Sequence, residues 1–106
     1  MWKVDQGSGT GVTGASYASA LDWKTAELAR KSILFKNTHA TQSLKYRLTG
    51  RVVEDGIERE LVLETVLEPG ETAEFHYDRQ WARLALLVTN GSGSASYQLD
   101  YEGEGA

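Results

Sequence analysis

The feature that most constrains this chain is a two-residue alternation of apolar and polar side chains in several short segments. In residues 44–53, Leu44, Tyr46 and Leu48 fall on one face, and mostly charged or hydroxyl side chains fall on the other. Successive side chains of a β-strand point to opposite faces, so this period predicts a half-buried strand. Asp-Gly and Pro-Gly turn signals separate such segments. The pattern predicts a protein of short antiparallel strands.

Seven segments of this kind can be recognised. The predicted strands are residues 16–23, 32–37, 44–53, 57–67, 72–77, 81–90 and 95–102. Only residues 24–31 have a helix-forming composition, and we expect a loop or a single helical turn there, because short isolated helices are marginal. A parallel sheet needs long crossover connections, which the sequence lacks. The predicted fold is all-β: a single antiparallel β-sandwich over residues 16–106, immunoglobulin-like or jelly-roll-like, with about seven strands.

The alternation also predicts which side chains form the core. They are Leu44, Tyr46, Leu48, Leu61, Leu63, Leu84, Leu86, Val88, Tyr97 and Leu99. The register matters because a shift of one residue moves every side chain of a strand to the other face.

Residues 1–15 precede the first predicted strand and contain four glycines among Ser and Thr. This composition predicts a flexible N-terminal arm. Trp2 and Val4 at its tip are the candidate partner-binding residues, which we expect to become ordered when the arm binds a neighbouring subunit. A second interpretation stays open, in which Trp2 folds back onto its own sandwich. The N-terminus lacks the layout of a secretory signal.

Charge is distributed unevenly along the chain. Residues 1–53 carry eight Lys or Arg and three Asp or Glu, whereas residues 54–106 carry three and twelve. Either basic strands pair with acidic strands in one sheet, or opposite ends of neighbouring molecules meet in an assembly. The net charge of −4 disfavours binding to nucleic acid. No apolar run approaches the roughly 20 residues of a membrane-spanning helix.

Two short motifs match known patterns without their structural context. Residues 9–14 fit the dinucleotide-binding pattern G-x-G-x-x-G, but that pattern functions between a strand and a helix. We therefore interpret it as linker. Asn90-Gly91-Ser92 is a formal glycosylation sequon and also a good hairpin turn, and the turn interpretation is favoured.

No constellation of residues predicts catalysis, a cofactor or a metal site. The chain has no cysteine, and its two histidines, His39 and His76, lack metal-ligand spacing. The many carboxylates between Glu54 and Glu74 alternate with apolar residues along strands, which is unlike a calcium loop. We therefore expect no enzymatic activity and no cofactor.

The aromatic side chains leave one other function open. Trp23, Trp81 and the tyrosines are typical of a sandwich core, but exposed rings could stack on sugars. The alternative prediction is an extracellular β-sandwich module that binds carbohydrate or protein.

Several segments resemble a known kind of protein. They are residues 19–22 (SALD), 33–38 (ILFKNT), 43–46 (SLKY), 64–71 (ETVLEPGE), 78–84 (DRQWARL) and 97–101 (YQLDY). Their layout resembles the small β-sandwich structural proteins of tailed-bacteriophage virions, of the decoration (capsid cement) or head–tail joining type. The resemblance implies a non-enzymatic virion protein, made in the host cytoplasm, that stabilises capsid or head–tail subunits. It further implies protein partners and repeated copies, with no nucleic-acid or membrane partner.

Overall fold

A computed structural model describes residues 3–78, 81–90 and 94–105, and these residues form eight strands and no helix. The strands are β1 (Lys3–Val12), β2 (Ala18–Lys24), β3 (Arg30–Asn37), β4 (Leu44–Arg51), β5 (Arg59–Leu67), β6 (Thr72–Tyr77), β7 (Arg83–Thr89) and β8 (Ser96–Gly105). The all-β prediction is confirmed, with one strand more than the sequence predicted. No helix that could cross a membrane is present in these ranges.

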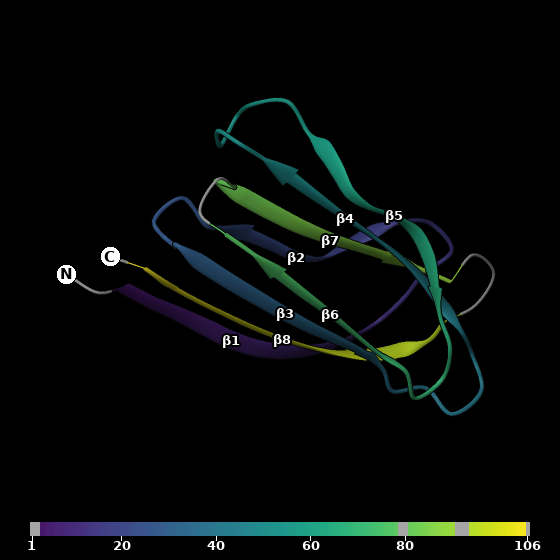
Figure 1. The fold of residues 1–106 in the computed structure, drawn as a ribbon. Helices are drawn as coiled ribbons and strands as arrows, with labels where there is room; N and C mark the ends of the chain where they lie inside the picture. The colour runs from purple at the N-terminus through teal and green to yellow at the C-terminus, as the bar shows by residue number, and fades with distance from the viewer. Residues whose placement is uncertain (1–2, 79–80, 91–93, 106) are drawn as a thin grey trace.

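The strands form two four-stranded antiparallel sheets that pack face to face (Figure 1). Sheet A has the order β1-β8-β3-β6, and sheet B has the order β2-β7-β4-β5. Most connections pass from one sheet to the other, so sequence neighbours rarely pair. Eight strands in this double-sheet arrangement are a jelly roll. Of the two sandwich types predicted, the strand order therefore matches the jelly-roll-like one.

The core lies between the sheets, and most of the predicted core residues occupy it. Fully buried are Leu44, Tyr46, Leu48, Leu84, Leu86, Val88 and Leu99. Leu61 and Tyr97 are partly buried against them. The prediction was wrong for Leu63, which is 72% exposed. The reason is an irregularity in pairing: Tyr46 lies opposite Thr65 but Leu48 lies opposite Val62, so the alternation along β5 slips.

Aromatic rings join the two sheets in the middle of the core. The ring of Phe35 on β3 lies 5.8 Å from that of Tyr46 on β4, and 5.4 Å from that of Tyr97 on β8. Tyr46 also meets Phe75 on β6 at 5.6 Å. Tilted and edge-on contacts at these distances stabilise beyond the area that they bury. The interior therefore depends on ring packing between the sheets as well as on aliphatic contacts.

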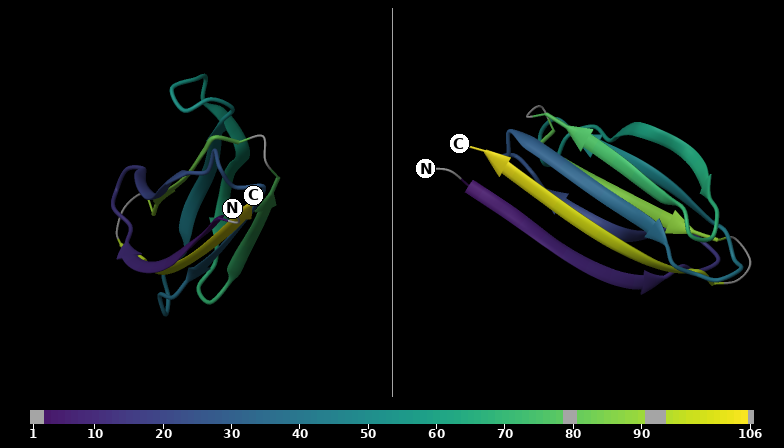
Figure 2. Two further views of the ribbon diagram at one scale, coloured as in Figure 1. Left: turned by 90° about the vertical axis from the view of Figure 1, so that its left-hand side faces the viewer. Right: turned by 60° about the horizontal axis from the view of Figure 1, so that its bottom comes forward.

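The predicted flexible arm, residues 1–15, contains a strand among its described residues, and residues 1–2 lie outside the described residues. Lys3–Val12 is β1, and it pairs with β8 in unbroken register from Lys3 opposite Gly105 to Val12 opposite Ser96 (Figure 2). Two of the four glycines that suggested flexibility, Gly7 and Gly11, have a packing role. A Cβ atom at Gly7 would lie 2.6 Å from the hydroxyl of Tyr101. Tyrosine rings of β8 thus occupy the space above β1, and only glycine leaves that space free.

Two buried polar side chains anchor the ends of β3. Asn37 is fully buried; its Nδ2 donates to the carbonyls of Gln42 and Leu67 at 2.9 and 3.0 Å, and its Oδ1 accepts from the His39 N–H. At the other end, the Nζ of buried Lys31 donates to the Asp78 carbonyl at 2.7 Å. Burial lowers the pKa of Lys31 to about 8. A buried amine thus sits where an apolar residue would normally be expected.

Candidate partner-binding surface

The outer face of sheet B carries a ladder of opposite charges. On neighbouring strands, the Nε of Arg47 on β4 lies 3.0 Å from Oε1 of Glu60 on β5. Tyr17, from the β1–β2 connection, donates its hydroxyl proton to Glu64 at 2.6 Å, and its ring lies 5.4 Å from the Arg47 guanidinium. Burial and the Glu64 hydrogen bond raise the pKa of Tyr17 to about 12. These contacts match the first interpretation of the uneven charge, in which basic and acidic strands pair within one sheet.

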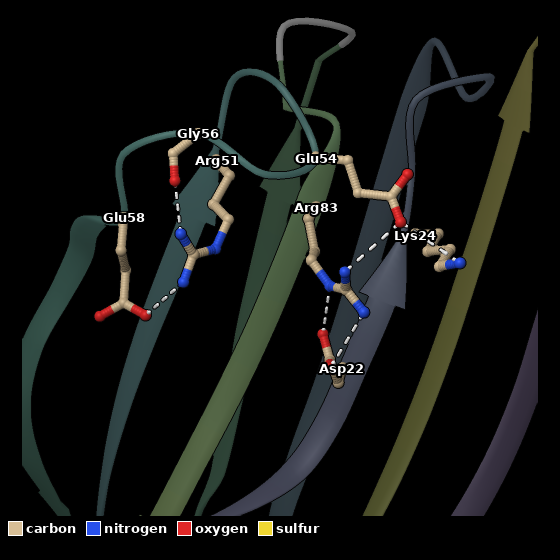
Figure 3. Close-up of polar contacts among 7 residues, drawn as sticks. All are labelled: Asp22, Lys24, Arg51, Glu54, Gly56, Glu58 and Arg83. Atoms are coloured by element: carbon tan, nitrogen blue, oxygen red, sulfur yellow. Dashed lines mark hydrogen bonds and ion pairs between the residues drawn. The ribbon is translucent and has the colours of Figure 1, made fainter.

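The connection between β4 and β5 is tied to the sheet by Arg51, the last residue of β4 (Figure 3). One guanidinium nitrogen donates to the Gly56 carbonyl, and another lies 3.3 Å from Oε2 of Glu58. The Asp55-Gly56 turn predicted from sequence is therefore stabilised by the side chain of Arg51 on the preceding strand. This gives residues 52–58 a defined shape where they leave the sheet.

A second arginine continues the network on β7 (Figure 3). Arg83 makes two hydrogen bonds to the Asp22 carboxylate on β2, at 2.6 and 3.1 Å. It also lies 3.5 Å from Glu54, which pairs in turn with Lys24 at 3.2 Å. Strands β2 and β7 and the β4–β5 connection are thus joined by one set of charges.

These charges surround a cavity of about 480 Å³ on the outer face of sheet B. Its lining is Ser19, Asp22, Thr49, Gly50, Arg51, Glu54, Asp55, Glu58, Arg83, Ala85 and Leu87. Both arginines in the lining are already bound to carboxylates, so they are poor receptors for an added anion. No nucleophile and base are paired in it, and no group of three or more acids or histidines within the described ranges could hold a metal ion.

Beside the cavity, large apolar side chains are exposed along the β4–β5 hairpin. We define the hairpin surface as Val52, Val53 and Ile57, which are exposed in the β4–β5 connection; Leu63 and Val66 are also exposed, further along β5. Ile57 is the extreme case at 91%. Turns normally carry polar residues, and exposed apolar groups gathered on one element mark interaction sites more often than isolated ones do. Figure 1 shows this hairpin projecting from the body of the sandwich.

The predicted binding residues lie elsewhere. Val4 is on β1 in sheet A, where it is 55% exposed, and Trp2 lies outside the described residues. The structure does not bring Val4 together with the hairpin surface, which connects two strands of sheet B. Sequence analysis missed that surface although a signal was present. Val52, Val53 and Ile57 flank a turn, where large apolar side chains have no core to enter.

The dinucleotide-like pattern and the two histidines have local structural settings, whereas residues 91 and 92 of the Asn90-Gly91-Ser92 motif lie outside the described residues. Residues 9–14, with the dinucleotide-like pattern, lie on the edge strand β1 and just after it, and no helix follows. His39 accepts backbone N–H groups of Thr41 and Gln42 on its Nδ1. His76 on β6 contacts Ser32 and Glu74. Each histidine therefore has local partners in its own part of sheet A or its loops.

No protein-family model matches the chain, and no curated protein matches it in sequence. Solved structures do match the fold. One is a protein of the Bacillus endospore appendages, described as disulfide-linked pili, with a TM-score of 0.61 at 15% identity over 99% of this chain and 89% of that one. PirA matches with a TM-score of 0.63 at 16% identity, over 90% of this chain and 92% of that one.

A third match comes from infectious bursal disease virus, Gx strain. Its TM-score is 0.57 at 12% identity, and it covers 98% of this chain but only 31% of the viral one. Identities this low establish a shared fold alone. The matches therefore identify the fold of this chain and do not identify its function.

Proposed function

We propose that the protein is a non-enzymatic structural subunit of a virion that binds neighbouring capsid or head–tail subunits through its hairpin surface. The observation that supports this proposal is the exposure of Val52, Val53 and Ile57 on a projecting hairpin whose base is fixed by Arg51. A preorganised apolar surface loses little entropy when a partner covers it. The proposal also places the protein in the virion, after synthesis in the host cytoplasm.

The pilus and virus matches are compatible with this proposal, because pili and virus particles are both assemblies. The pili are described as disulfide-linked. This chain has no cysteine, so its own contacts with neighbours must be non-covalent or use other chemistry. The exposed apolar residues of the hairpin surface are therefore the candidates for such a non-covalent contact.

The test is co-sedimentation with particles assembled from the genome that encodes the chain, combined with electron microscopy of particles made with and without it. Burying a side chain of the size of Ile57 stabilises by roughly 1.5–3 kcal/mol. Ile57→Ser should therefore weaken particle binding by about tenfold or more. Leu34→Ser, on the outer face of sheet A, is the matched control and should bind normally.

The alternative is an extracellular module that binds carbohydrate or protein. The observation in its favour is the polar cavity beside Thr49 and Arg83. Binding of glycans by the wild-type protein, lost in Thr49→Val and retained in Ile57→Ser, would favour this alternative. No particle association in the co-sedimentation experiment would rule out the virion proposal.

A further inference from the structure

Strand β1 is an edge of sheet A, and within the described residues only β8 lies beside it (Figure 2). The outer side of such a strand presents backbone N–H and C=O groups that can pair with another strand. Edges are normally protected by short length, charges, proline or β-bulges. β1 is ten residues long, and its register with β8 has no irregularity. Asp5 on β1 accepts a hydrogen bond from the Trp23 Nε1–H at 2.9 Å, so its charge does not protect the edge.

The other three edges are better protected. β2 has a register shift between Ser19 and Leu21, and β5 has two shifts against β4. β6 has only six residues, with Glu74 and His76 exposed on it. The free edge most open to strand addition is therefore β1.

The outward-facing residues of β1 are symmetric about Ser8. Moving outward from Ser8 in both directions, Gln6 corresponds to Thr10 and Val4 to Val12, while of the inward-facing positions Gly7 corresponds to Gly9 but Asp5 to Gly11. Both valines are exposed, at 55% and 66%. They share the outer face of the sheet with Ser8, since side chains two or four residues apart on a strand point the same way.

We propose that the partner of this edge is a second copy of the chain, joined by antiparallel pairing of the two β1 strands about a two-fold axis at Ser8. In that register Val4 of each copy lies opposite Val12 of the other, and Gln6 lies opposite Thr10. The two sheets A merge into one continuous sheet of eight strands. This contact stands independently of the hairpin surface, which remains exposed.

Charge favours this pairing as well. Residues 6–12 of β1 contain no charged side chain, and Asp5 of each copy lies opposite Gly11 of the other. The acidic residues on the neighbouring strand are Asp100 and Glu102 of β8. In the paired state the two β8 strands are three strand spacings apart, roughly 14 Å, which exceeds the Debye length of about 8 Å in physiological salt. Pairing through β6 would instead place Glu74 of both copies on adjacent strands.

Cysteine cross-linking tests the register directly, because the chain has no thiol of its own. In the proposed pair, residue 8 faces itself at a distance that a disulfide can span. Residue 10 is separated from its counterpart by roughly 13 Å along the strand. Ser8→Cys should therefore form covalent dimers on mild oxidation, whereas Thr10→Cys should stay largely monomeric. Equal dimer yields from both variants, or none from Ser8→Cys, would overturn the proposal.

Analytical ultracentrifugation tests the interface without cysteine. The wild-type protein should show a concentration-dependent dimer, and Val12→Lys should weaken it by at least about tenfold, because the change occurs twice in each dimer. Thr72→Lys adds the same charge at an exposed site on the opposite edge of sheet A and should leave the dimer intact. Ile57→Ser should also leave it intact, which separates this contact from the proposed particle-binding surface. A wild-type protein that is monomeric at every concentration contradicts the inference.

Discussion

The buried amine of Lys31 gives a prediction whose size follows from the structure. Lys31 is 1% exposed, and burial lowers its pKa from 10.5 to about 8. The folded protein therefore binds this proton less tightly than the unfolded chain does. Folding is penalised below about pH 8, and stability is regained as pH rises from 8 toward 10.5. The whole shift corresponds to about 3 kcal/mol.

The variant Lys31→Met removes the charge and keeps a flexible apolar stem of similar length. Its advantage in unfolding free energy over the wild type should be largest at pH 7 and should shrink by about 2 kcal/mol by pH 9.5. The tyrosines with raised pKa values are present in both proteins, so their contributions cancel in the difference. The Asp78 carbonyl that Lys31 contacts belongs to an exposed residue, and water can replace the lost donor.

Urea denaturation followed by tryptophan fluorescence at pH 7, 8, 9 and 9.5 measures this difference. Lys45→Met, at an exposed lysine on β4, is the control and should show no comparable trend. A difference between Lys31→Met and wild type that is constant with pH, or that grows with pH, would refute the assignment of the penalty to a buried amine.

Three further experiments test the packing and the buried hydrogen bonds. Leu86→Ala should lower the unfolding free energy by roughly 2–5 kcal/mol, while Leu87→Ala on the other face of β7 should lower it by less than about 1 kcal/mol. Chemical denaturation measures both losses, and a larger loss for Leu87→Ala would contradict the register of β7. Asn37→Ala removes three hydrogen bonds and should cost roughly 2–4 kcal/mol, seen as a shift of the urea midpoint; an unchanged midpoint would mean that water replaces them all. Gly7→Ala should destabilise the protein by roughly 1–3 kcal/mol because the Tyr101 ring must move. Gly9→Ala should be neutral or slightly stabilising, since no atom lies within 4 Å of its added Cβ. Equal effects of the two variants in thermal melts would argue against the packing role of Gly7.

Much of the fold could be predicted because most strands bury only one face. The alternation of Leu44, Tyr46 and Leu48 specified β4, and the same logic placed Leu86 inward and Leu87 outward correctly. Leu63 was misplaced because a bulge depends on how two strands pair, and a single strand's period does not record that. Strand order was equally out of reach, since it depends on contacts between distant segments.

The strand β1 in the N-terminal segment was not predicted, for a different reason. Composition treats glycine as a source of disorder, but Gly7 and Gly11 match the positions of Tyr101 and Tyr97 on a strand far along the chain. The hairpin surface was missed because Val52, Val53 and Ile57 were placed inside predicted strands, whereas β4 ends at Arg51 and β5 begins at Arg59. Both errors concern residues whose surroundings the alternation along their own segment does not record.

The position of β8 has a consequence for how the nascent chain folds. β8 lies between β1 and β3, so these two strands are joined in sheet A only through the strand that comes last of the eight along the chain. β1 can pair within sheet A only after β8 has been synthesised, because Val12 lies opposite Ser96 and Lys3 lies opposite Gly105. Closing so long a loop is entropically unfavourable, and folds rich in such distant pairings fold slowly. During translation, therefore, the glycine-rich strand β1 stays without its β8 partner until β8 has left the ribosome, and chaperones have that interval in which to bind it.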